Sequence, residues 1–288
     1  ITMKILITGA FGQLGQVLCA TLNNFNEVIK TGRNIPKGQK GITLDICNKI
    51  ILKDIIKISK PDILINLAAL TNVDLCEQKP TLAKQVNVIG VENICEVFSG
   101  KIIHISTDYV FDGKEGPYNE NNRTYPISVY GKTKLKAENI ILNHNSKNLI
   151  IRANVIYGNS KHNKASFFNW VINSLNKNNK IDVVNDQYNN PTWSKSIANV
   201  ICLCIKHNIK GVYHWGDKEF LNRYEFALKI ARKFNLDEKL IQPITTSNLN
   251  QIAKRPLNSG LISEKLKNIL NVEAPSVDEC LKMIKETF

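Results

Sequence analysis

The sequence predicts an α/β fold, in which a doubly wound parallel sheet is followed by a smaller, mixed C-terminal region. In the first 155 residues, short apolar runs rich in β-branched residues alternate with segments of helical periodicity. Continuous apolar strands of this kind are typical of parallel sheets that helices cover on both faces. With 288 residues, 43% hydrophobic and 22% charged, the chain is long enough to bury a substantial core.

The elements expected in the first part are five strands separated by four helices. The strands are KILIT (4–8), EVIKT (27–31), DILIN (62–66), KIIHIS (101–106) and NLIIR (148–152), and the helices lie near 12–23, 48–59, 80–98 and 128–144. After residue 155 the pattern is less regular. There we expect helices near 164–177, 194–207, 222–234, 263–270 and 276–287, a strand at 211–215, and a short strand and turn within 181–193.

Two parts follow from this pattern. We expect a dinucleotide-binding domain of the Rossmann type at residues 1–155, because its strands and helices alternate in the doubly wound manner. Residues 156–288 are expected to form a substrate-binding region, some of whose elements return to the first domain. No repeat or flexible linker separates the two parts.

Composition excludes several classes of function. No secretory signal precedes the first strand, and no apolar stretch approaches the roughly 20 residues that span a bilayer, so we expect a cytoplasmic protein without a membrane partner. The seven cysteines are scattered without a CxxC pair, which argues against disulfides and against a metal site. The net charge is +13, but the lysines are spread along the chain, so we expect no nucleic-acid partner. A basic surface instead attracts phosphorylated small molecules.

A glycine-rich turn directly follows the first strand. In GAFGQLG, Gly9, Gly12 and Gly15 have the spacing GxxGxxG and lie between a strand and a helix. Glycine lets the backbone turn tightly there, and it lets a pyrophosphate approach the amides of the helix N-terminus. The turn therefore predicts a dinucleotide cofactor.

The second strand indicates which dinucleotide is bound. An acidic residue at its end would hold the ribose hydroxyls of NADH, whereas a basic residue tolerates the 2′-phosphate of NADPH. The strand ends EVIKTGRN, no carboxylate follows it, and Lys30 and Arg33 are nearby. We therefore expect NADPH, with NADH as the alternative. Asp45 is placed to accept hydrogen bonds from adenine, or else to cap the helix that begins near Asn48.

Two further motifs supply polar side chains near the end of the fourth strand. STDYVFDG (106–113) follows that strand, where ligands of open α/β sheets bind, and YGKTK follows about twenty residues later. Tyr130 and Lys134 are four positions apart and share one helix face. A neighbouring ammonium favours the phenolate, which would lower the tyrosine pKa. By itself this spacing is common on solvated helices.

Together, the glycine turn, STDYVFDG and YGKTK resemble the extended short-chain dehydrogenase/reductase superfamily. That resemblance implies that Thr107 binds the substrate carbonyl, Tyr130 transfers a proton, and Lys134 binds the nicotinamide ribose and lowers the tyrosine pKa. It implies a cofactor site made of Gly9, Phe11, Gly12, Gln13, Leu14, Arg33, Asp45, Ile46, Ala68, Ala69, Tyr130 and Lys134. Homodimers are common in this superfamily, and a homodimer is expected by that analogy.

Additional motifs narrow the resemblance to the dTDP-4-dehydrorhamnose reductases. They are NLAALTNVDLCE (66–77), VVNDQYNNPT (183–192) and AKRPLNSGL (253–261). The implied activity is NADPH-dependent reduction of the C4 ketone of dTDP-4-dehydro-6-deoxy-L-mannose to dTDP-L-rhamnose. The implied substrate residues are Thr107, Asp108, Asn154 and Arg255, although Arg255 is equally compatible with a surface position beside a proline.

Two features of the sequence leave alternative functions open. Where these reductases read Arg-Thr-Ser-Trp-Val-Tyr, this chain reads RANVIYG (152–158), so that Asn154 and Val155 replace a serine and a tryptophan of the sugar pocket. A reductase of another nucleotide-linked 4-keto-6-deoxy sugar, for example a UDP-linked one, is therefore the first alternative. The second is a non-catalytic, NADP-binding subunit, because residues 211–236 also resemble the regulatory beta subunit of methionine adenosyltransferase.

Overall fold

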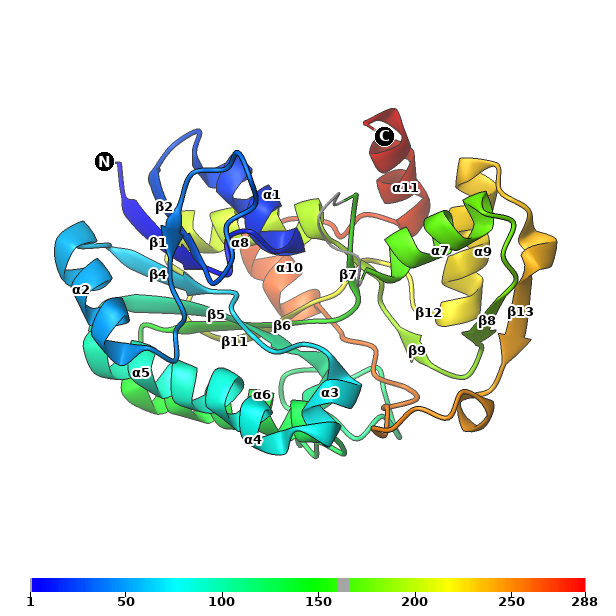
Figure 1. Cartoon of the computed structure of the whole chain (residues 1–288), viewed down its shortest axis with the longest axis horizontal. Helices are drawn as coiled ribbons and strands as arrows, with labels where there is room; N and C mark the ends of the chain where they lie inside the picture. Colours follow the sequence, from blue (N-terminus) through cyan, green and yellow to red (C-terminus); the bar gives the residue numbers. More distant parts are fainter. Residues whose placement is uncertain (1, 160–165, 288) are drawn as a thin grey trace.

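A seven-stranded parallel sheet forms the centre of the computed structural model, which describes residues 2–159 and 166–287 (Figure 1). The strand order is β11-β6-β5-β4-β1-β2-β3. All six pairings within the sheet are parallel, which confirms the predicted fold class. The strands are β1 (Lys4–Thr8), β2 (Glu27–Gly32), β3 (Ile42–Thr43), β4 (Ile63–Asn66), β5 (Lys101–Thr107), β6 (Leu149–Ala153) and β11 (Gly211–Trp215).

Helices cover both faces of this sheet because alternate strand residues point to opposite sides. Ile5 and Ile7 of β1 pack on the face covered by α1 (Gln13–Leu22), α8 (Ser194–Lys206) and α10 (Glu264–Leu270). Leu6, between them, packs on the opposite face. That face is covered by α2 (Lys49–Ser59), α5 (Gly90–Val97) and α6 (Val129–His144).

The helix expected at 80–98 is observed as three consecutive segments. They are α4 (Pro80–Lys84), a π-helical stretch η1 (Gln85–Ile89) and α5. A further short helix, α3 (Val73–Gln78), was not predicted. The Asn72 side chain caps α3 by accepting a hydrogen bond from the amide of Leu75 at 2.9 Å. This cap is a local signal, but six residues are too few to show helical periodicity.

A second hydrophobic cluster lies beside the sheet. It contains the buried faces of α7 (Phe167–Asn176), α9 (Arg223–Phe234) and α11 (Val277–Glu286), which pack with β8 (Ile181–Val184) and β13 (Ile241–Ile244). The first two residues of the helix expected at 164–177 lie outside the described residues. The short elements are β7 (Ile156–Tyr157), β9 (Tyr188–Asn189), β10 (Thr192–Trp193), β12 (Leu221–Asn222), and the 3₁₀ turns η2 (Asp108–Val110), η3 (Glu238–Leu240) and η4 (Thr246–Asn248).

Three elements that follow residue 155 in the chain lie in the layers of the first sheet. β11 pairs with β6 as an edge strand, while α8 and α10 pack against α1 and the sheet (Figure 1). Elements from before and after residue 155 therefore share the same layers. The boundary between two domains at this residue stays a prediction. Within the described part of the chain, no helix is long and apolar enough to cross a membrane.

A buried ion pair fixes α6 against β6. Arg152 donates to both carboxylate oxygens of Glu138, at 2.9 and 2.6 Å, and both side chains are almost completely buried. A third Arg152 nitrogen lies 3.3 Å from Nε2 of His214 on β11. Bidentate geometry is the arrangement in which a buried guanidinium and a carboxylate compensate one another best.

We expect Glu138→Gln to lower the free energy of unfolding by about 3–5 kcal/mol, because the buried guanidinium of Arg152 would lose its counter-charge. Urea denaturation measures the change. Glu264→Gln is the matched control, since Glu264 is 62% exposed in its pair with Lys267 and should cost at most about 0.5 kcal/mol. Equal losses in the two variants would contradict the expectation.

Candidate active site

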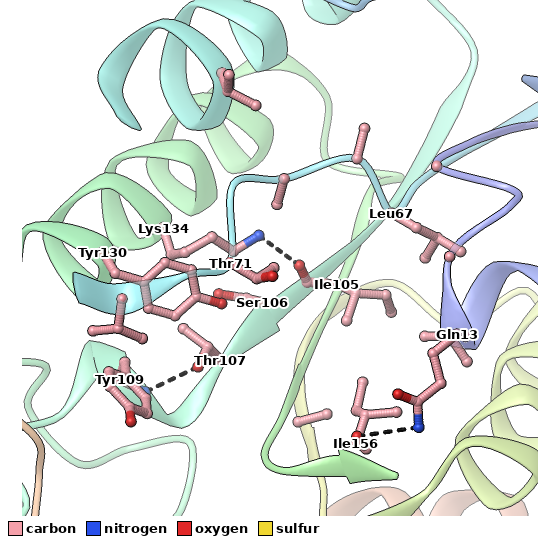
Figure 2. Close-up of a pocket in the computed structure, with 18 of the residues that line it drawn as sticks. Gln13, Leu67, Thr71, Ile105, Ser106, Thr107, Tyr109, Tyr130, Lys134 and Ile156 are labelled. Atoms are coloured by element: carbon pink, nitrogen blue, oxygen red, sulfur yellow. Dashed lines mark hydrogen bonds between the residues drawn. The ribbon is translucent and has the colours of Figure 1, made fainter. Parts of the chain in front are cut away.

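A cavity of about 620 Å³ opens at the carboxyl ends of the sheet strands. This is the place where open α/β sheets bind their ligands, and the volume suits a cofactor-sized molecule. Figure 2 shows Thr107, Tyr130 and Lys134 close together on one side of the cavity, with Gln13 and Ile156 on the other. Fourteen of the sixteen residues expected at the site line it: Gly9, Phe11, Gly12, Gln13, Leu14, Arg33, Asp45, Ile46, Ala68, Ala69, Thr107, Asp108, Tyr130 and Lys134.

The glycine turn brings the N-terminus of α1 to this cavity. Gly9 has a φ of +69°, which side chains rarely adopt. A Cβ on Gly15 would lie 2.4 Å from the carbonyl oxygen of Gly9, so only glycine lets the helix pack this closely on the turn. Gly12, the N-cap residue, supplies no side-chain cap. The turn therefore forms a cradle that suits a pyrophosphate, with helix amides directed to it.

Residues at the other end of the cavity come from the loops after β2 and β3. Arg33 follows β2 directly, and Asp45 and Ile46 follow β3. The alternative role of Asp45 as a helix cap is wrong, because Asn48 caps α2 by accepting from the Ile51 amide at 3.2 Å. Asp45 instead accepts from the Cys47 amide at 2.9 Å, which holds its carboxylate at the cavity wall.

Tyr130 and Lys134 lie on the buried face of α6. Ser128 caps this helix through the Gly131 amide. A Cβ on Gly131 would lie 2.1 Å from the carbonyl oxygen of Tyr109, so this glycine lets the loop after β5 pack on the first turn of α6. Lys134 Nζ donates to the carbonyl oxygen of Ile105 at 2.7 Å, an interaction drawn in Figure 2.

Burial controls the charges of these two side chains. It raises the pKa of Tyr130 well above its usual value, while the hydroxyl of Thr107 acts in the opposite direction. The expected net fall of the tyrosine pKa below its usual value is therefore wrong for this structure, because burial is the largest influence on the phenol. Burial also lowers the pKa of Lys134, to about 8, because the ammonium is costly to desolvate.

Asp108 is hydrogen-bonded on both carboxylate oxygens. Thr107 Oγ1 donates to Oδ1 at 3.0 Å, and Ser259 Oγ donates to Oδ2 at 2.5 Å. Burial raises the pKa of Asp108 to about 6 in spite of these donors. Asp108 thus joins the end of β5 to the segment 253–261, and it lines the cavity from a buried position.

Asn154 does not line the cavity, and its role as a substrate residue stays a prediction. Its side chain is buried, and its amide nitrogen lies 3.3 Å from the carbonyl oxygen of Ser259. With the amide turned over, it pairs with both backbone groups of Asn190, at 2.6 and 3.2 Å. The Asn154 side chain thus connects chain segments behind the cavity wall by hydrogen bonds.

Arg255 also lies outside the cavity lining. Its guanidinium is bidentate with Asp74 of α3, at 2.6 and 2.9 Å, and the side chain is only 9% exposed, so the alternative of a surface arginine is wrong. Arg255 holds the pKa of Asp74 below its usual value. The amide of Ala253 donates to the same carboxylate at 2.9 Å. The pair therefore ties the segment 253–261 to α3.

Several cavity residues were missed by the sequence reasoning. Arg223, the first residue of α9, brings a partly buried cation into the wall, where it lies over the Phe167 ring at 5.1 Å. Ser106 and Ser166 line the cavity with buried hydroxyl oxygens that have no hydrogen-bond partner among the described residues. Ser106 is the first residue of the STDYVFDG motif, so the sequence contained a signal for it. Arg223 had no such signal, because only the fold brings α9 to this cavity. The described residues contain no cluster of three or more histidine, cysteine or acidic side chains arranged to hold a metal.

Comparison with known proteins gives a consistent result. The family model described as "RmlD substrate binding domain" matches residues 3–288. A dTDP-4-dehydrorhamnose reductase of Aggregatibacter actinomycetemcomitans is 34% identical, with 98% of each chain covered. The methionine adenosyltransferase 2 subunit beta of Xenopus laevis is 33% identical, covering 92% of this chain and 82% of the relative. The crystal structure of a Bacillus anthracis dTDP-4-dehydrorhamnose reductase in complex with NADP superimposes with a TM-score of 0.91, at 28% identity, over the whole of both chains.

We expect Gly15→Ala to weaken dinucleotide binding by about tenfold or more, because the new Cβ would force the turn away from α1. Quenching of tryptophan fluorescence by NADPH measures the affinity. Ala20→Ser, on the exposed side of the same helix, is the control and should bind normally. Normal binding by a folded Gly15→Ala protein would show that the turn does not contact the cofactor.

Proposed function

The chain belongs to the RmlD substrate binding domain family, and we propose that it reduces the C4 ketone of dTDP-4-dehydro-6-deoxy-L-mannose to dTDP-L-rhamnose with NADPH. The observation that carries the proposal is the grouping of Thr107, Tyr130 and Lys134 in one cavity with the glycine turn. A binding site for a dinucleotide alone would not require a buried phenol beside a buried ammonium. The arrangement suits a carbonyl reductase.

NADPH is the cofactor that the cavity suits best. The pyrophosphate would lie on the glycine turn, and Arg33, directly after β2, would meet the 2′-phosphate, with no carboxylate at the end of that strand to repel it. Bound NADPH supplies the hydride that reduces C4. The buried hydroxyl of Ser106, which has no partner among the described residues, is available to a ligand at the centre of the cavity.

Tyr130 is the proposed proton donor. Because burial raises the pKa of its phenol, the proton is held at neutral pH until negative charge develops on the substrate oxygen. Thr107 would turn its hydroxyl from Oδ1 of Asp108 to donate a hydrogen bond to the same oxygen. Lys134, one helical turn from Tyr130, would stabilise the phenolate left after proton transfer, since an ammonium favours a neighbouring anion.

We assign the anionic part of the substrate to the wall that α9 contributes. Arg223 places a guanidinium there, and a diphosphate is the kind of group that a guanidinium binds by charge and paired hydrogen bonds. Asp108, which also lines the cavity, would hold a sugar hydroxyl. Asn154 and Arg255 would act indirectly, by holding the segments that shape the sugar site.

A second candidate is favoured by one observation, the 33% identity to a methionine adenosyltransferase beta subunit. A chain with this role would bind a methionine adenosyltransferase catalytic subunit and reduce no keto sugar. Pull-down with that subunit, together with the turnover assay below, separates the two candidates. The expected homodimer and the cytoplasmic location stay predictions, and light scattering of the purified protein tests the first.

We expect the protein to oxidise NADPH when dTDP-4-keto-6-deoxy-L-hexose is generated in situ, and we expect Tyr130→Phe to lower kcat by about 10²–10⁴-fold. The loss of near-ultraviolet absorbance measures the rate. Tyr125→Phe is the matched control, because Tyr125 is 62% exposed and should leave the rate unchanged.

The nucleotide of the substrate is tested in the same assay. Turnover of the dTDP-linked sugar in preference to its UDP-linked counterpart supports the proposal, and the reverse preference supports the alternative reductase. If NADPH binds but neither sugar is reduced, the reductase assignment fails.

We expect kcat to fall about tenfold per pH unit above pH 8, because Lys134 loses its proton there and can no longer stabilise the phenolate of Tyr130. A kcat profile between pH 6 and 10, at saturating NADPH and keto sugar, measures the effect. A rate that stays constant to pH 10 would contradict this role of Lys134.

A further inference from the structure

A buried histidine lies directly behind Lys134. His104, on β5, is 1% exposed and is not part of the cavity lining. Its Nε2 lies 3.0 Å from Lys134 Nζ, and its Nδ1 lies 3.0 Å from the side-chain nitrogen of Asn66 at the end of β4. Thr8, at the end of β1, donates from Oγ1 to Oδ1 of Asn66 at 2.6 Å. A continuous chain of polar side chains thus crosses three strands and ends at the site.

We propose that His104 is a positioning residue, which accepts a hydrogen bond from Lys134 and thereby directs the third Nζ proton into the cavity. An ammonium has three protons and no acceptor. Among the described residues, the carbonyl oxygen of Ile105 takes one and Nε2 of His104 takes another. The remaining proton faces the cavity that Lys134 lines. The inference rests on the proposed function, in which Lys134 acts on the cofactor ribose and the phenolate.

This role requires one tautomer of His104. A neutral imidazole has one donor and one acceptor, so Nε2 accepts only if Nδ1 carries the proton. Nδ1–H then needs an acceptor, and the Asn66 amide supplies one when it is turned over from the orientation described above, so that its oxygen faces the ring and its nitrogen faces the Thr8 hydroxyl. In the orientation described above, the Asn66 nitrogen donates to Nδ1, so Nε2–H would face Nζ, and only an uncharged amine could accept it. The charge of Lys134 is therefore coupled to the tautomer of His104.

The surrounding charges favour the first arrangement. Burial and the adjacent Lys134 lower the pKa of His104 well below its usual value, so the ring is uncharged at neutral pH. On α6 itself, the titratable neighbours of Lys134 one turn away are Tyr130 and Glu138. Glu138 is bidentate with Arg152, so its carboxylate is already paired with another cation. This leaves the imidazole of His104 as the side chain that orients the ammonium.

Two substitutions separate positioning from packing. His104→Phe keeps an aromatic ring but removes both nitrogens, whereas His104→Gln offers an oxygen to Lys134 and a nitrogen to Asn66. If His104 positions Lys134, the Phe variant loses about tenfold or more in kcat and its alkaline pH limb shifts, while the Gln variant stays within about threefold of wild type. If His104 only fills space, both variants change the melting temperature but keep the wild-type kcat and pH profile, which would overturn the proposal.

A second measurement uses the unmodified protein and does not depend on turnover. In protein with ¹⁵N-labelled histidine, NMR reports which ring nitrogen of His104 carries the proton. A neutral Nδ1–H form at pH 7 supports the proposal, and an Nε2–H form or an imidazolium overturns it. This result decides the case if His104→Phe does not fold. Because wild-type turnover tests the reductase function separately, failure of one proposal is distinguishable from failure of the other.

Discussion

Burial of an ammonium group at the carboxyl end of β5 is the constraint on which the site depends. Lys134 is 3% exposed, and a charge so placed is unfavourable unless hydrogen-bond acceptors replace the lost water. The carbonyl oxygen of Ile105 and the ring of His104 provide these acceptors. One turn further along α6, Glu138 meets Arg152 of β6. Two buried polar contacts thus fix the register of α6 on the sheet, and with it the position of Tyr130.

The second constraint is the attachment of the segment 253–261 to the first sheet. Asp74 binds Arg255, and Asp108 accepts from Ser259. Both contacts join residues more than 150 positions apart in the chain, and the second lies next to Thr107 in the cavity wall. Polar side chains of the AKRPLNSGL motif therefore hold one wall of the cavity in place. Substitutions in this motif should affect the geometry of the bound substrate indirectly.

Val155 lies in RANVIYG, the stretch in which this chain departs from the reductases that it resembles. Its φ is +43°, an unusual conformation for a β-branched residue and one that costs about 1–3 kcal/mol. Val155 also lines the cavity, next to Ile156, whose carbonyl oxygen accepts from Gln13 at 3.3 Å. A small aliphatic side chain here gives the sugar site a different shape from one with an aromatic wall. Family membership therefore does not by itself determine which sugar this protein binds.

The sequence by itself determined the parallel sheet, the glycine turn and the pairing of Tyr130 with Lys134, because each depends on residues that are close together in the chain. Only the tertiary structure decided that Arg255 binds Asp74, that Asn154 faces Asn190 and that α9 brings Arg223 to the cavity. It also reversed the expected pKa shift of Tyr130, since desolvation by burial outweighs the hydrogen bond from Thr107. Burial and the choice of partner are set by contacts between distant segments, which local periodicity and motif spacing do not contain.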